Sequence, residues 1–231
     1  MTNQQTIKQP ISVEGVGLHT GAAVTLTFNP APENHGFVFV RTDLENQPKI
    51  PASAKNVIST DRGTTIGRGD AVVNTVEHVL AALVGMDIDN CLIEINGPET
   101  PIMDGSSKFF VEAIEKAGIE EQQAPREVYE IKEPIRFELP EEGIEIMALP
   151  ADKYEVTVMV DYGTKVLGSQ NASLENVSDF KENISHARTF SFLHELEYLL
   201  EHGLIKGGDL NNAIVYVDKQ PSAETMEKLK A

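Results

Sequence analysis

The sequence predicts an α+β protein built of two domains, and three observations carry that prediction. The first 70 residues alternate short β-rich runs with turn signals, a pattern typical of strands joined by tight loops. Strand and helix patterns then alternate along the rest of the chain. Between them lies a polar segment, 119–127 (IEEQQAPRE), which contains Pro125 and shows no periodic apolar face. This segment predicts a linker between a first domain at 1–120 and a second domain at 127–231.

Local patterns predict the elements of the first domain. Residues 75–84 carry an apolar helical stripe, and residues 106–118 form an amphipathic helix pattern that stops at Gly118. The apolar run at 90–95 (NCLIEI) predicts a buried strand, which places Cys91 in the core. Strands of the opening are expected at 9–17, 22–30, 35–41 and 64–67.

In the second domain we expect strands first and helices afterwards. A last helix is expected to begin after Pro221, with Ser222 as its cap. The β-rich runs occupy 127–139, 143–150 and 154–162, and the helical patterns occupy 177–187 and 190–203.

Composition excludes several classes of function. Hydrophobic residues make up 41% of the chain and charged residues 24%, which is typical of an ordered globular protein. The net charge of −17 argues against nucleic acid or an anionic membrane as a partner, because both attract an excess of Lys and Arg. No apolar run approaches the ~18 residues that span a bilayer, and the polar N-terminus lacks the pattern of a signal peptide. We therefore expect a cytoplasmic protein without a membrane-spanning segment.

Glu77 and His78 stand side by side within an otherwise apolar helical stretch, 74–83 (NTVEHVLAAL). The apolar stripe of that helix consists of Val76, Val79, Leu80 and Leu83. One interpretation is structural, because Asn74 and Glu77 are spaced as a capping box and His78 is then a surface or core histidine. The other is chemical: a metal-binding imidazole beside a general base, as zinc hydrolases use to activate water. The pair by itself leaves both interpretations open.

Further segments of the chain give this pair a context. They are GVGLHTG (15–21), GMDIDN (85–90), GPETPIMDGSS (97–107), ISHARTFSF (184–192) and GLIKGGDLNNAIV (203–215). Together with TVEHVLAAL they resemble, in the same order, the UDP-3-O-acyl-N-acetylglucosamine deacetylase family, the zinc amidases of lipid A biosynthesis. The resemblance runs from about residue 6 to the last residue. It implies two similar domains, each of a β-sheet layered with α-helices, with the active site between the domains.

The resemblance implies roles for three chemical residues. It makes His78 a ligand of Zn²⁺, Glu77 the general base, and Thr189 the hydroxyl that helps to stabilise the tetrahedral oxyanion. On its own, the pattern around Thr189 favours a helix cap instead. The implied reaction removes acetate from UDP-3-O-acyl-N-acetylglucosamine, which is then the small-molecule partner.

The resemblance also implies a substrate site. An insert at about 190–216 is expected to form a passage for the fatty acyl chain, and Tyr162 is expected against uracil, although a tyrosine at a strand end is also typical of a rim residue. Charged residues of the insert helix, such as Glu195, are expected on a solvated face. The implied substrate-binding residues are Leu18, His19, Asp161, Tyr162, Phe190, Gly208 and Ala213. Apolar side chains that could line the passage, or equally pack as core, are Phe190, Phe192, Leu196, Leu199 and Leu200.

These 231 residues do not contain every group that the resemblance implies. The family takes two further zinc ligands from an H-K-x-x-D motif and its general acid from a later histidine, and no H-K-x-x-D occurs here. The sequence therefore predicts a C-terminally incomplete chain, about the first three quarters of a deacetylase or the front of one fused to a 3-hydroxyacyl carrier-protein dehydratase. We expect it to be inactive alone. The alternative is a non-catalytic α/β module that binds a sugar nucleotide or a protein partner.

Overall fold

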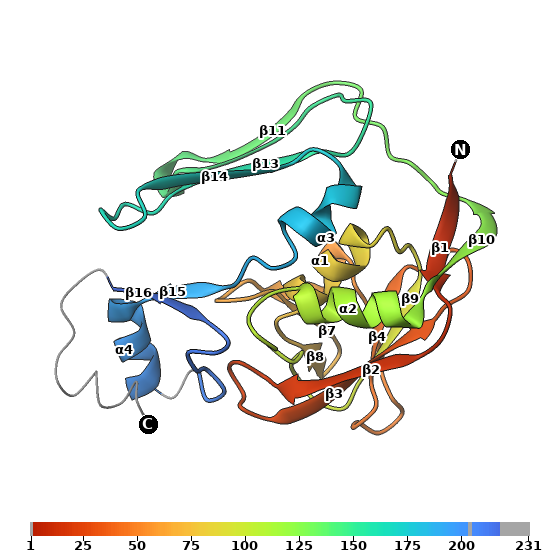
Figure 1. The fold of residues 1–231 in the computed structure, drawn as a ribbon, viewed down its shortest axis with the longest axis horizontal. Coiled ribbons are helices and arrows are strands. Elements are labelled where there is room, and N and C mark those ends of the chain that lie inside the picture. The colour runs from red at the N-terminus through yellow and green to blue at the C-terminus, as the bar shows by residue number, and fades with distance from the viewer. Residues whose placement is uncertain (1, 203–204, 218–231) are drawn as a thin grey trace.

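A five-stranded sheet carries the core of the first part of the chain. In the computed structural model, which describes residues 2–202 and 205–217, its strand order is β2-β3-β9-β4-β5 (Figure 1). All neighbouring strands are antiparallel except β4 and β9, which are parallel. The strands are β2 (Ile11–Val16), β3 (Ala23–Pro30), β4 (Phe37–Arg41), β5 (Lys49–Pro51) and β9 (Cys91–Ile95).

Alternation of side chains explains which face of this sheet is buried. Every second residue of β3 and of β9 points to the same face, so Leu26, Phe28 and Ile93 lie in the core. Cys91 lies in the core as predicted, and its burial raises the pKa of the thiol to about 12. The thiol is therefore protonated and unreactive in the folded protein.

Two helices pack beside this sheet, α1 (Glu77–Gly85) and α2 (Lys108–Ala117) (Figure 1). The ring of Phe110 on α2 meets that of Phe28 edge to face, with centroids 6.3 Å apart. Gly118 ends α2 with φ of 73°, as the sequence predicts. A small three-stranded sheet precedes α1. It consists of β6 (Val57–Ser59), β7 (Thr65–Arg68) and β8 (Ala71–Val73), after a 3-10 turn at Ala54–Asn56.

The predicted linker is wrong for most of its length. Residues Ile119–Pro125 form strand β10, which pairs antiparallel with β1 (Asn3–Ile7). Strand pairing needs backbone groups and not an apolar face, and side chains of the segment are used as well: Gln122 accepts a hydrogen bond from Asn90 at 2.7 Å. Because the segment is polar, its sequence does not indicate the strand that it forms. That strand is the last element of the first part of the chain.

The second part of the chain, which follows β10, consists of small two-stranded pairs and short helices. Two antiparallel hairpins lie away from the five-stranded sheet, and their apolar side chains are largely exposed (Figure 1). They are β11 (Ile135–Leu139) with β12 (Ile144–Ala148), and β13 (Val156–Asp161) with β14 (Ser169–Leu174). A parallel pair, β15 (Phe190–Phe192) and β16 (Ile214–Tyr216), flanks α4 (Leu193–Glu201). Shorter elements are a 3-10 turn at Pro140–Glu142, another at Val177–Asp179, and α3 (Phe180–Asn183).

Residues 190–192 correct the predicted start of the insert helix. They form a strand, and α4 begins only at Leu193, because the aromatic rings of Phe190 and Phe192 pack against Tyr216 of the neighbouring strand. The helix expected after Pro221 lies outside the described residues. Within the described part of the chain, no helix has the length and apolar character needed to cross a membrane.

The short helix α3 joins the second part to the first. The ring of Phe180 lies directly against Gly85 at the end of α1, where a Cβ would overlap it. Phe180 therefore belongs to the same buried cluster as the core of the first part. Beside it, Lys181 pairs with Glu115 of α2 at 2.6 Å between Nζ and Oε1. Both side chains are partly exposed, so the buried ring and not the ion pair fixes this junction.

Candidate active site

The start of α1 does not contain the capping box that Asn74 and Glu77 suggest. Val76 is the N-cap residue, and its side chain makes no capping hydrogen bond. The amide oxygen of Asn74 accepts a bond from the hydroxyl of Thr65 at 2.9 Å instead. Glu77 Oε2 accepts a bond from the backbone N–H of Thr64 at 3.0 Å. Glu77 therefore bonds to the 62–64 loop, and the predicted capping box is wrong.

His78 follows Glu77 in a half-buried position. Burial lowers the pKa of its imidazole below the ordinary value, against the opposing attraction of Glu77 and Asp104. The ring is therefore neutral near pH 7, which is the form that binds a metal ion. Among residues 2–202 and 205–217, no three His, Cys, Asp or Glu side chains are grouped closely enough to hold a metal. Within the described residues, His78 is therefore not part of such a group, and its role as a metal ligand stays a prediction.

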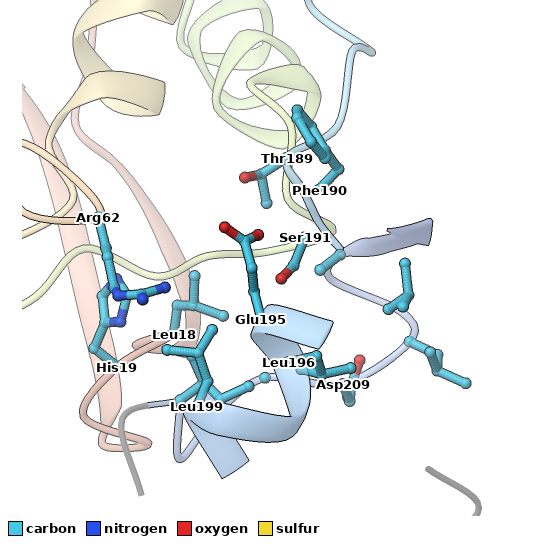
Figure 2. A pocket seen from close by; sticks show the side chains of 15 residues that line it. Leu18, His19, Arg62, Thr189, Phe190, Ser191, Glu195, Leu196, Leu199 and Asp209 are labelled. Atoms are coloured by element: carbon cyan, nitrogen blue, oxygen red, sulfur yellow. The ribbon is translucent and has the colours of Figure 1, made fainter. Parts of the chain in front are cut away.

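A pocket of about 320 Å³ lies between the two parts of the chain (Figure 2). Leu18, His19 and Arg62 come from the first part, and the second part supplies the opposite wall. In Figure 2, Arg62 and Glu195 reach toward the pocket from opposite sides, and Thr189 faces the same space. This volume is in the range of roughly 300–1,000 Å³ that small-molecule sites occupy. The wall of the second part consists of Thr189, Phe190, Ser191, Glu195, Leu196, Leu199, Ile205, Gly208, Asp209, Leu210, Ala213 and Val215.

Thr189 is held in this wall by the turn that precedes α2. Its backbone N–H donates to the carbonyl oxygen of Gly105 at 2.7 Å, and its own carbonyl accepts from Ile214 on β16 at 3.0 Å. The neighbouring Arg188 donates from Nε to the carbonyl oxygen of Asp104 at 2.6 Å. Two residues after Gly105, the hydroxyl of Ser107 donates to the backbone oxygen of His78 at 3.0 Å. The turn 104–107 therefore connects Thr189 to His78.

The other implied binding residues fall into two groups. Leu18, His19, Phe190, Gly208 and Ala213 all line the pocket. Asp161 and Tyr162 do not line it. Asp161 is exposed at the end of β13, and Tyr162 packs edge to face against Phe190 with ring centroids 5.3 Å apart. Tyr162 therefore lies behind Phe190, which lines the pocket. Its contact with uracil stays a prediction.

The apolar residues expected in the passage are placed unequally. Phe190, Leu196 and Leu199 line the pocket, whereas Phe192 is buried in the aromatic cluster with Tyr162 and Tyr216. The side chain of Leu200 lies outside what the structure describes. The wall that α4 provides thus combines two apolar side chains, Leu196 and Leu199, with the charged Glu195.

Sequence reasoning missed three charged residues of this pocket, Arg62, Glu195 and Asp209, and one beneath it. Arg62 was given no role, and Glu195, expected on a solvated face, lines the pocket although it is exposed. Glu99 is fully buried below the Leu18–His19 turn. Glu99 and Asp209 had a signal, because they lie within the motifs at 97–107 and 203–215. Nothing in the local pattern around Arg62 indicates that it lines a pocket together with residues of α4, which lies more than 100 residues later in the sequence.

Comparisons with known proteins match nearly the whole chain. A family model described as LpxC: UDP-3-O-acyl N-acetylglycosamine deacetylase matches residues 4–229. The bifunctional enzyme LpxC/FabZ of Chlorobaculum tepidum is 51% identical over 221 residues, which cover 95% of this chain and 47% of that protein. Its namesake in Bacteroides thetaiotaomicron is 48% identical over 229 residues, covering 99% of this chain and 50% of that protein.

A relative with a single named activity is similar over the same region. The UDP-3-O-acyl-N-acetylglucosamine deacetylase of Myxococcus xanthus is 46% identical over 215 residues, covering 92% of this chain and 68% of that protein. The chain thus spans about half the length of the bifunctional relatives and about two thirds of this one. Since the match extends over both parts of the fold, the chain belongs to the LpxC family of UDP-3-O-acyl N-acetylglycosamine deacetylases.

Proposed function

We propose that the full-length protein deacetylates UDP-3-O-acyl-N-acetylglucosamine in the cytoplasm, as a metal-dependent step of lipid A biosynthesis. One observation carries this proposal: two walls of the pocket are connected through hydrogen bonds to the short segment that holds Glu77 and His78. The loop of Arg62 reaches Glu77 through Thr64, and the turn 104–107 joins Thr189 to His78. Hydrogen bonds therefore connect the binding pocket to the candidate general base and metal ligand.

In this proposal Glu77, Thr189 and His78 each have a separate role in the reaction. Glu77 takes the proton of the attacking water, because its carboxylate has only the Thr64 N–H as a hydrogen-bond donor among the described residues. The Thr189 hydroxyl donates to the oxyanion, since its backbone is fixed on Gly105 and its side chain faces the pocket (Figure 2). His78 holds the metal as one ligand. Zinc, when bound, supplies a Lewis acid that activates water and polarises the amide.

The pocket fits the acyl group of such a substrate. Its α4 wall presents Leu196 and Leu199, and Leu18 approaches from the other side. Charged residues also line the pocket: Arg62, Glu195 and Asp209 (Figure 2). A long alkyl chain is stabilised by the apolar side chains because it leaves water on binding.

The test is acetate release from UDP-3-O-acyl-N-acetylglucosamine by the purified full-length protein. Dialysis against a chelator is expected to abolish acetate release, and added Zn²⁺ is expected to restore it. His78→Ala should keep the fold, lose bound metal and lose the response to added Zn²⁺. Turnover that survives complete metal removal contradicts the metal-dependent mechanism. Binding of the sugar nucleotide without any acetate release supports the non-catalytic module instead.

Tyr162→Ala tests the proposed uracil contact. We expect the full-length variant to bind UDP more weakly by about 1–3 kcal/mol, the usual loss when a base stops stacking on an aromatic ring. Binding of an acyl-glucosamine without the nucleotide should change less. Isothermal titration calorimetry with both ligands makes the comparison. Equal losses for the two ligands would show that Tyr162 acts by supporting Phe190, which it packs against.

A further inference from the structure

Glu99 is the most deeply buried carboxylate near the pocket, and the proposed mechanism does not use it. Only 1% of its surface is exposed, and no ion pair involves it within the described part of the chain. A buried acidic side chain without a cation is retained in proteins only where hydrogen bonds compensate for its lost hydration. Its surroundings therefore show what it holds in place.

The carboxylate of Glu99 accepts hydrogen bonds from two segments that are distant in sequence. The backbone N–H of His19 lies 3.0 and 3.2 Å from the two oxygens, and the N–H of Thr20 lies 2.9 Å from Oε2. The hydroxyl of Thr20 donates to Oε2 at 2.8 Å, and that of Thr75 donates to Oε1 at 3.0 Å. The carboxylate thus joins the turn at 17–21 to the residue that precedes the Val76 N-cap of α1.

Each of the two segments carries a feature that needs this support. Thr75 has φ of +58°, a left-handed conformation that is rare for a β-branched residue. It stands two residues before Glu77, so its backbone sets where α1 begins. On the other side, a Cβ at Gly17 would overlap Oε2, so the glycine permits the close approach of the turn. That turn presents Leu18 and His19 to the pocket.

We propose that Glu99 is a positioning residue that keeps the Leu18–His19 wall of the pocket in register with the start of α1. The inference rests on the proposed function and deepens it. One carboxylate bonds to both segments, so a change at Glu99 shifts the substrate wall and the catalytic pair together. Changes at the two threonines separate the effects, because each hydroxyl lies on one side only.

The experiment uses the full-length protein and steady-state acetate release. Thr20→Val removes the hydroxyl on the pocket side, and we expect KM to rise about tenfold with kcat unchanged. Thr75→Val removes the hydroxyl on the α1 side, and we expect kcat to fall about tenfold with KM unchanged. Glu99→Gln is expected to show both effects, since an amide nitrogen in place of either oxygen faces an N–H or O–H donor. Thr20→Ser and Thr75→Ser keep the hydroxyls and should behave as the wild type.

Matched controls make the outcome decisive. Glu94→Gln changes a carboxylate on β9 that accepts a bond from Asn29 at 3.2 Å, and it should leave both kinetic constants unchanged. If Glu99→Gln does not fold, the threonine variants decide. Valine variants that match their serine counterparts, or a folded Glu99→Gln with both constants within about twofold of the wild type, overturn the role of Glu99. A wild-type protein that releases no acetate refutes the proposed function, and this inference with it.

Discussion

Glu77→Gln is expected to lower the kcat of the full-length enzyme by about 10²–10⁴, because a general base contributes about that much to a proton transfer. The amide cannot take a proton from water, yet its oxygen can still accept the Thr64 N–H that Glu77 now accepts at 3.0 Å. The 62–64 loop and bound metal should therefore be retained. Single-turnover acetate release measures the rate of the chemical step, and metal analysis of the same sample measures the bound metal.

An exposed carboxylate on the neighbouring helix provides the control. Glu112 on α2 lies 3.8 Å from Lys108 and has no contact with the pocket, so Glu112→Gln should leave kcat unchanged. Near-normal turnover by Glu77→Gln would show that Glu77 only fastens the loop. A loss of activity accompanied by a loss of metal would instead assign it to the metal site.

Gly105→Ala is expected to reduce kcat by about 10²–10³, the usual effect of losing one oxyanion donor. Gly105 has φ of +84°, and a Cβ there would overlap the backbone oxygen of Asn212 and lie 3.1 Å from Thr189 Cγ2. Its carbonyl also accepts the Thr189 N–H at 2.7 Å. The added methyl group must therefore displace the backbone of Asn212 and crowd the side chain of Thr189, which shifts its hydroxyl in the wall that faces the pocket. Acetate release and thermal unfolding should be measured together.

Gly143→Ala separates backbone strain from displacement of Thr189. Gly143 also has a positive φ, +69°, but no atom lies within 4 Å of a Cβ there. Both variants should lose stability from the strained backbone, about 1–2 kcal/mol, and only Gly105→Ala should lose activity as well. If the two variants kept equal kcat, the docking of Thr189 on Gly105 would have no part in the reaction.

The local pattern predicted most of the elements in the first part of the chain. Alternating apolar residues identified β3 and β9, and the 3.6-residue period with Gly118 identified α2. It failed at β10, whose polar residues pair through the backbone with a strand over 100 residues earlier. It failed also at Phe190–Phe192, where packing of aromatic rings against β16 overrode a helical pattern. In both cases a partner distant in sequence decided the structure.

For the candidate site, the sequence by itself determined which residue types are present: a carboxylate beside an imidazole at 77 and 78, a threonine at 189 and an apolar insert. The tertiary structure decided what each one contacts. It gave Glu77 a bond to Thr64 in place of a helix cap, seated Thr189 on Gly105, and placed Arg62 and Glu195 on opposite sides of one pocket. These contacts join segments up to about 130 residues apart, whereas periodicity and capping reflect only interactions within a few residues along the chain.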